Sequence, residues 1–388
     1  MNKKIFIFMT VLIIICALLL ASCDNRNGEA PPSGNAGLPS GEQDNELSSG
    51  NSNPDGFVYE LNADKASYTV KGLAKDNNIT QIVIPSTYQG KPVTQIDSYA
   101  FRNCSRIVSV SLSPNIMSIG TYAFYNCTAL QGVYITDMSS WCNINFNGSY
   151  SNPLEYAHKL YLNNKLVTDL IIPADITRID YYAFYNCVDL ASITVEPNNA
   201  VYKSQNNCLI EKQTDRLVLG CKNSVVPDYV KSIGSSAFEG CKGLTSIEIP
   251  SGVDYIGFYA FANCVDLQSI VIKSEVNIIC DGVFKNCSSL ESIEIPNGVM
   301  EIGMFAFSGC SSLKNVELPS GITDIGQGAF SFCVNLTKIV IPVGVTRIGA
   351  LAFVNCPNLK IYCELSTPPS GWDKTWNGSC EVEFDYFN

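Results

Sequence analysis

The chain of 388 residues contains a single histidine, His158, and only 16% of its residues are charged. One histidine leaves at most one position for Ser-His-Asp, Cys-His or H-E-x-x-H machinery. No C-x-x-C pair occurs, which argues against a zinc site of ordinary spacing. The net charge is −11 and no basic run follows Lys4, so the chain lacks the clustered Lys and Arg of nucleic-acid binding. We therefore expect no catalytic residue, no metal, no cofactor and no nucleic-acid partner.

The N-terminus has the pattern of an exported protein. A basic start is followed by an apolar run from Ile5 to Ala21 and then by small residues before Cys23. The stretch Leu20-Ala21-Ser22-Cys23 resembles the lipobox of bacterial lipoproteins. This predicts a signal peptide over 1–22 and lipidation of Cys23, which would hold the protein at the bacterial cell membrane or outer surface by its lipid alone. A transmembrane anchor is the alternative, because the apolar run is nearly long enough to span a bilayer.

Residues 23–56 are mostly Gly, Ser, Asn, Pro and acidic residues, with almost nothing apolar. Such a segment cannot bury enough surface to offset its ordering entropy. We expect a disordered tether there.

The rest of the chain is dominated by a repeat that places Cys three residues after Phe. The unit reads C-x-x-L-x-x-I-x-I-P-x-x-V-x-x-I-G-x-x-A-F-x-x, and the last six copies follow one another at 23 residues. The nine copies are Phe101/Cys104, Phe124/Cys127, Phe184/Cys187, Phe238/Cys241, Phe261/Cys264, Phe284/Cys287, Phe307/Cys310, Phe330/Cys333 and Phe353/Cys356. One unit cannot bury its own apolar face, so the copies must stack into a solenoid.

Each position of the unit has a physical interpretation. The I-x-I element alternates with period two and predicts one short strand per coil, ended by a proline that lacks an N–H. Phe and Leu are expected to stack over their counterparts in neighbouring coils. A turn residue with positive φ is expected at the Gly of the unit, where Asp97 and Asp180 would tolerate the same conformation. These glycines are Gly120, Gly234, Gly257, Gly303, Gly326 and Gly349.

This unit resembles the leucine-rich repeat of BspA-like bacterial surface proteins, with L-x-x-I-x-I in place of L-x-x-L-x-L, over residues 57–388. The resemblance implies an α/β repeat fold: a curved leucine-rich repeat solenoid with a parallel β-sheet on the concave face and loops or short helical turns on the convex face. A right-handed β-helix polysaccharide lyase also has coils of about this length, but the strict Phe–Cys spacing favours the leucine-rich repeat.

The solenoid is expected to have a cap at each end. We predict an N-terminal cap over 57–95, repeats over 96–360 and a C-terminal cap over 361–388. Irregular insertions are expected near 137–173 and 197–227, each with a hairpin, one of them turning at Asn163-Asn164.

Most of the 17 cysteines occupy the repeat position, where a thiol is a small buried side chain. Cys363 and Cys380 flank a C-terminal loop and could form a disulfide. Pairing between neighbouring repeat thiols also remains open, because close stacking need not give disulfide geometry.

Two sets of side chains are candidates for binding. Outward positions of the I-x-I strands should form a mildly acidic face, unless they are ordinary solvated strand residues. This face comprises Ser246, Glu248, Ser269, Ser292, Glu294, Asn315, Glu317 and Lys338. The second set consists of aromatics beside Ala-Phe, which favour interfaces or simply shield the coil edge. Its members are Tyr99, Tyr122, Tyr125, Tyr182, Tyr185, Tyr259 and Phe305.

The family resemblance implies adhesion, so we expect a non-enzymatic, monomeric binding protein whose partner is an extracellular host or microbial surface protein. The alternative is a glycan-binding or glycan-cleaving surface lipoprotein. In that case Trp and Tyr would serve as sugar platforms, and a pair of carboxylates could perform the hydrolysis without histidine.

Overall fold

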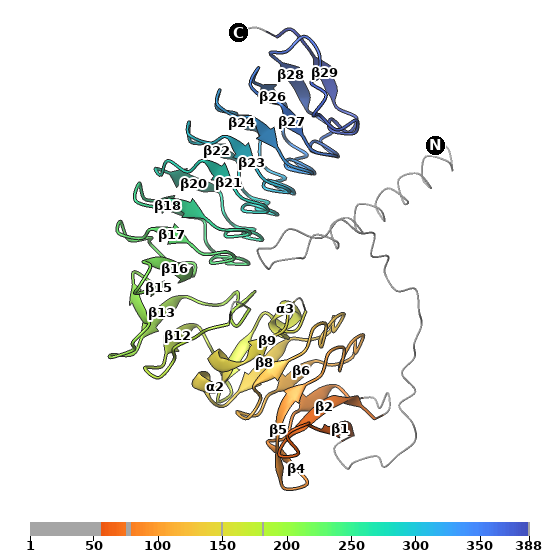
Figure 1. Ribbon diagram of the computed structural model, residues 1–388, viewed down its shortest axis with the longest axis vertical. Helices are drawn as coiled ribbons and strands as arrows, with labels where there is room; N and C mark the ends of the chain where they lie inside the picture. The colour runs from red at the N-terminus through yellow and green to blue at the C-terminus, as the bar shows by residue number, and fades with distance from the viewer. Residues whose placement is uncertain (1–55, 75–78, 149, 181, 387–388) are drawn as a thin grey trace, which may run out of the picture.

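Stacked coils of about 23 residues build a long, curved solenoid in the computed structural model (Figure 1). The structure describes residues 56–74, 79–148, 150–180 and 182–386. The predicted signal peptide, Cys23 and residues 24–55 of the predicted tether lie outside this part. The predicted solenoid, with parallel sheets and a 23-residue spacing, is confirmed.

The I-x-I element forms the first row of strands, in which equivalent residues of successive coils pair in parallel. Its members are β3 (Gln81–Val83), β6 (Ser109–Ser111), β8 (Gly132–Ile135), β10 (Leu160–Leu162), β12 (Asp169–Ile172), β13 (Ser192–Val195), β18 (Ser246–Ile249), β20 (Ser269–Ile272), β22 (Ser292–Glu294), β24 (Asn315–Glu317), β26 (Lys338–Ile341), β28 (Lys360–Cys363) and β29 (Glu381–Glu383). The row is divided into separate sheets, with breaks that include one between β13 and β18.

The V-x-x-I element forms a second row of short parallel strands, although the sequence predicted one strand per coil. Its members are β2 (Tyr68–Leu73), β5 (Lys91–Ile96), β7 (Ser118–Ile119), β9 (Asn145–Phe146), β17 (Ser232–Ile233), β19 (Tyr255–Ile256), β21 (Ile278–Ile279), β23 (Glu301–Ile302), β25 (Asp324–Ile325) and β27 (Arg347–Ile348). Most of these strands have two residues, which is too short for alternation to show in a sequence.

In the described ranges, antiparallel hairpins and two short helices supply the irregular parts. The hairpins involve β1 (Phe57–Leu61), β4 (Thr87–Tyr88), β11 (Lys165–Leu166), β14 (Tyr202–Gln205), β15 (Cys208–Glu211) and β16 (Arg216–Leu219). The predicted turn at Asn163-Asn164 joins β10 to β11, and both asparagines have positive φ. The helices are α2 (Met138–Asn143) and α3 (Leu154–Ala157).

The glycine of the repeat unit is needed for close packing and not, as the sequence suggested, for positive φ. Neither the six glycines nor Asp97 and Asp180 are among the residues with left-handed φ. A Cβ on Gly326 would lie 2.5 Å from the carbonyl carbon of Gly303 in the preceding coil. The left-handed conformation falls instead on the residue before Cys, such as Asn263 or Asn286, and on the residue before Ala-Phe, such as Tyr259.

Replacement of Gly326 by alanine should therefore lower the free energy of unfolding by about 1–3 kcal/mol, because the new methyl group overlaps the backbone of the coil below. Gly321 is the matched control, since its Cβ would come no closer than 3.9 Å to a neighbouring atom. Urea unfolding followed by circular dichroism compares the two variants. Equal stabilities would show that close approach is not the reason for glycine here.

The buried phenylalanines form two stacks. Phe101 lies on Phe124 with 5.4 Å between ring centroids, and a second stack runs from Phe238 to Phe353 with spacings of 5.0–5.8 Å. Phe184 is buried between the two stacks. The expected single stack is thus interrupted where the insertions occur, and the apolar core divides into two clusters at the same place.

The C-terminal segment ends the second stack with a modified coil. Trp376 packs edge-on against Phe353 at 5.9 Å, and Cys380 donates to the carbonyl oxygens of Phe353 and Cys356. Trp372 contacts Trp376 and is equally buried. The last coil is therefore covered by tryptophan in the place where other coils have phenylalanine.

Candidate binding surfaces

The predicted binding residues lie on the outward side of the first row of strands. All eight are exposed, and the isoleucines and valines between them are buried. The parallel register sets Ser246 opposite Ser269, Ser292 opposite Asn315, and Asn315 opposite Lys338. The structure therefore brings these residues together on one face, which we call the strand face, with a break in the hydrogen-bonded ladder between β20 and β22.

The acidic residues of the strand face differ in their neighbours. Glu248 pairs with Lys273 at 2.7 Å, and both side chains are more than half exposed, so this pair contributes little stability. Glu294 and Glu317 lie directly opposite each other in the register. No ion pair joins either of them to a basic side chain in the described part of the chain. Two like charges are therefore held side by side.

Lys338, at the C-terminal end of the strand face, is held by aromatic rings. Its Nζ lies 5.2 Å from the ring centroid of Tyr362 and 5.1 Å from that of Tyr386, and it donates to the Tyr386 hydroxyl at 3.0 Å. The hydrogen bond to Tyr386 raises the pKa of the Lys338 ammonium group. The sequence did not indicate this clamp, because Tyr386 lies outside the repeat pattern.

The repeat thiols form an internal hydrogen-bonded column. Cys264, Cys287 and Cys310 each donate to the carbonyl oxygen of the Phe 26 residues earlier, at 3.0–3.1 Å. Burial raises the pKa of the Cys310 thiol to about 12. At neutral pH such a thiol carries almost no thiolate, so it is a poor nucleophile and a poor metal ligand.

All 15 cysteines of the described residues are free thiols. The disulfide suggested between Cys363 and Cys380 is absent, because Cys363 points into the core from β28 while Cys380 extends the thiol column. No cluster of His, Cys, Asp or Glu in the described ranges has the arrangement of a metal site. His158 is exposed at the C-terminal end of α3, with left-handed φ.

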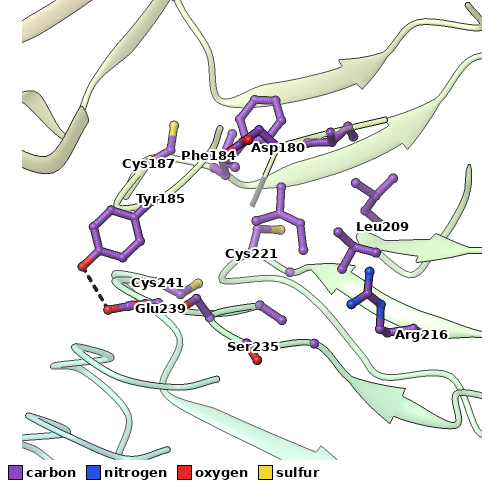
Figure 2. A pocket seen from close by; sticks show the side chains of 18 residues that line it. Asp180, Phe184, Tyr185, Cys187, Leu209, Arg216, Cys221, Ser235, Glu239 and Cys241 are labelled. Carbon is purple, nitrogen blue, oxygen red and sulfur yellow. Dashed lines mark hydrogen bonds between the residues drawn. The ribbon is translucent and has the colours of Figure 1, made fainter. Parts of the chain in front are cut away.

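A cavity of about 350 Å³ lies at the interruption between the two phenylalanine stacks (Figure 2). Phe184, Cys187 and Cys221 line it from the N-terminal core cluster, and Cys241 from the C-terminal one. The sequence did not predict this cavity, although the two insertions flank it.

The acidic groups of the cavity wall already have partners. The Tyr185 hydroxyl donates to Glu239 Oε1 at 3.0 Å, as Figure 2 shows. Burial raises the pKa of Asp180, although its carboxylate accepts from Arg178 Nη2 at 3.1 Å and from the Tyr182 amide. These bonds stabilise the junction of the two clusters, so the cavity is the weaker candidate for a binding site.

The aromatic residues fall into two environments. Trp141, Trp372 and Trp376 are all at least 93% buried and cannot serve as sugar platforms. Tyrosines at the edge of the N-terminal coils are exposed or half-buried, and Tyr99 is 51% exposed. Of the predicted aromatic platforms, only tyrosines are accessible.

Comparison with known proteins gives a consistent result. The model of the BspA type leucine rich repeat region, in six copies, matches residues 73–153, 155–219 and 218–300. No curated protein matches the chain.

Solved structures of bacterial leucine-rich repeat proteins are similar to this chain. A leucine rich cell surface protein from Faecalibacterium prausnitzii is 28% identical over 73% of this chain and 92% of its own, with a TM-score of 0.44. The pneumococcal vaccine antigen PcpA is 18% identical over 79% of this chain and 80% of its own, with a TM-score of 0.51, which supports the fold. The described residues contain no helix that is long and apolar enough to cross a bilayer.

Proposed function

Because this chain belongs to the BspA-type leucine-rich repeat family, we propose that it is a non-enzymatic binding protein displayed on the bacterial surface. We propose that it recognises an extracellular protein, of host or microbial origin, through the strand face. The predicted lipid on Cys23 and the Gly- and Ser-rich tether would carry the solenoid away from the membrane, and the protein would act as a monomer. Membership of a family of bacterial surface proteins supports this location.

The single observation that carries the proposal is that Glu294 and Glu317 lie directly opposite each other on neighbouring strands. Like charges directly opposite each other destabilise a sheet, so the fold gains nothing from them. A partner with a basic surface would relieve this repulsion on binding. Ser292 and Asn315, two residues before these glutamates, are exposed and have short side chains, so a partner can approach the strands there.

We propose that the protein is not an enzyme because its thiols and its histidine are poorly placed for catalysis. The thiol column is buried, and burial raises the pKa of thiols such as Cys310, so these thiols are poor nucleophiles at neutral pH. His158 lies at the C-terminal end of α3, where its carbonyl oxygen accepts from the Val188 amide. These groups support packing and capping.

Replacement of both glutamates by lysine should strongly reduce capture of the partner. We expect the Glu294→Lys/Glu317→Lys variant to recover its partner from host and microbial surface extracts at least about tenfold less well than the wild type, since charge complementarity becomes repulsion. The matched control is Glu275→Lys/Glu301→Lys, which makes the same change in net charge at exposed positions outside the first row. Quantitative mass spectrometry of the captured proteins gives the measurement. Equal capture by both double variants and the wild type would refute the proposed face.

A further inference from the structure

Five tyrosines form a continuous ladder at the edge of the N-terminal coils, away from the strand face. Tyr99 lies parallel to Tyr122 with centroids 5.6 Å apart, and Tyr122 lies on Tyr150 at 5.8 Å. Tyr156 follows at 6.2 Å, and Tyr125 meets Tyr122 and Tyr150 edge-on at 5.7 and 5.0 Å. We call these five residues the tyrosine ladder.

The backbone under the ladder has a left-handed conformation that recurs at the same position in other coils. Tyr99 and Tyr122 have φ of 62° and 57°, a conformation that bulky side chains rarely adopt. The equivalent residues in other coils also have positive φ, whether small or large; they are Ser236, Tyr259, Gly282, Phe305, Gly328 and Leu351. The stacking of the tyrosine rings, and not the backbone conformation, therefore distinguishes the ladder.

Aromatics at this position in the C-terminal coils serve a different purpose. The ring of Tyr259 lies across Gly282 of the next coil, and that of Phe305 lies across Gly328, where an added Cβ would overlap it. Each ring thus covers the backbone of its neighbour. In the ladder no glycine follows, and ring meets ring. Coverage of the coil edge therefore explains Tyr259 but not the stacked tyrosines.

Polar groups lie beside the ladder. The Asn126 amide donates to Asn103 Oδ1 at 3.2 Å, and both asparagines are exposed. The Arg102 guanidinium lies 5.5 Å from the Tyr99 ring centroid and 5.7 Å from that of Tyr125. Within the described ranges, no carboxylate forms an ion pair with Arg102. The strip therefore offers ring edges, hydroxyls, amides and one guanidinium.

From this set of groups we propose that the tyrosine ladder with Arg102 is a second binding site, whose ligand is a neutral glycan. Aromatic rings pack against the C–H faces of sugars, while amides and a guanidinium donate to their hydroxyls. Tyrosine rings and asparagine amides recur from coil to coil, which suits a polymer of repeated units. The net charge of −11 disfavours an anionic polymer. A protein partner would favour an apolar core with a polar rim. Here Arg102 lies beside the rings of Tyr99 and Tyr125, and the Tyr156 hydroxyl accepts from the Asn126 backbone amide.

The test is native gel electrophoresis of the full chain through gels that contain a polysaccharide. Amylopectin, galactomannan and a β-1,3-glucan are the neutral probes, and alginate is the anionic one. We expect at least one neutral polysaccharide to retard the wild type. The Tyr99→Gly/Tyr122→Gly variant should lose affinity by about tenfold or more, because two rings are removed. It should still fold, because glycine adopts positive φ without strain.

The control is Tyr259→Gly, which removes one ring at the same repeat position in the C-terminal coils and should bind like the wild type; the single variant Tyr99→Gly is compared with it and should bind more weakly. Glu294→Lys/Glu317→Lys should also bind the polysaccharide unchanged, so the result is independent of the strand face. The proposal is wrong if no neutral probe retards the wild type, if alginate alone does so, or if the double glycine variant is retarded as strongly as the wild type. It is equally wrong if the ladder variant loses capture of a protein instead.

Discussion

Replacement of Phe307 by alanine should lower the free energy of unfolding by about 3–5 kcal/mol, the range for a large aromatic removed from a packed core. Phe307 is fully buried, with Phe284 at 5.4 Å on one side and Phe330 at 5.1 Å on the other. Its ring is therefore shared by two interfaces between coils, and the cavity would weaken both. Urea unfolding followed by circular dichroism measures the change.

Phe184 provides the comparison for this experiment. It occupies the same position in the repeat unit but lines the cavity between the two stacks, so less packing is lost with its ring. We expect Phe184→Ala to cost less than half as much as Phe307→Ala. A cost for Phe184→Ala as large as that for Phe307→Ala would show that the interruption of the stack has no energetic meaning.

The second large effect is a loss of stability in alkali. Burial raises the thiol pKa from 9.0 to about 12 at Cys127, Cys142, Cys187, Cys208, Cys310, Cys356 and Cys363. The folded chain holds these protons more tightly than the unfolded chain does. The stabilisation is complete below pH 9 and is lost as the pH rises toward 12. Each of these thiols therefore contributes to the loss of stability over the pH range in which the unfolded chain has released the proton and the folded chain still holds it.

Urea titrations between pH 7 and 11 should therefore show stability falling steeply above pH 9. Lysines and tyrosines also titrate in this range, so the control is Cys310→Ser, whose hydroxyl does not titrate and can still donate to the Phe284 carbonyl. Its stability should fall less steeply than that of the wild type, by up to about 1.4 kcal/mol per pH unit. Identical slopes would show that the Cys310 thiol has the same pKa in the folded and the unfolded chain, which would contradict the prediction.

The sequence predicted those features that depend on a repeated side chain. Phe307, Cys310 and Ile293 recur at a fixed spacing, and their positions are buried in almost all coils for the same reason, with Cys104 only partly buried. The outward direction of Glu294 and Glu317 follows from the alternation of side chains along a strand. These statements need only periodicity, which one sequence contains.

Features that depend on contact between backbones were missed or misread. The glycine of the unit looked like a turn residue, because a sequence does not show how close Gly326 comes to Gly303. The cavity beside Phe184 arises where coils fail to stack, and the clamp on Lys338 comes from a tyrosine 48 residues away. Each depends on long-range packing that no local pattern records.

The interruption beside Phe184 should also limit how far local unfolding spreads along the solenoid. In a stacked array each coil depends on its immediate neighbours, so disorder travels along the array until the chain of contacts is broken. Here the contacts change from one core cluster to the other within residues 202–221. We therefore expect the two clusters to unfold as separate cooperative units, so that a lesion in one leaves the binding surface carried by the other intact.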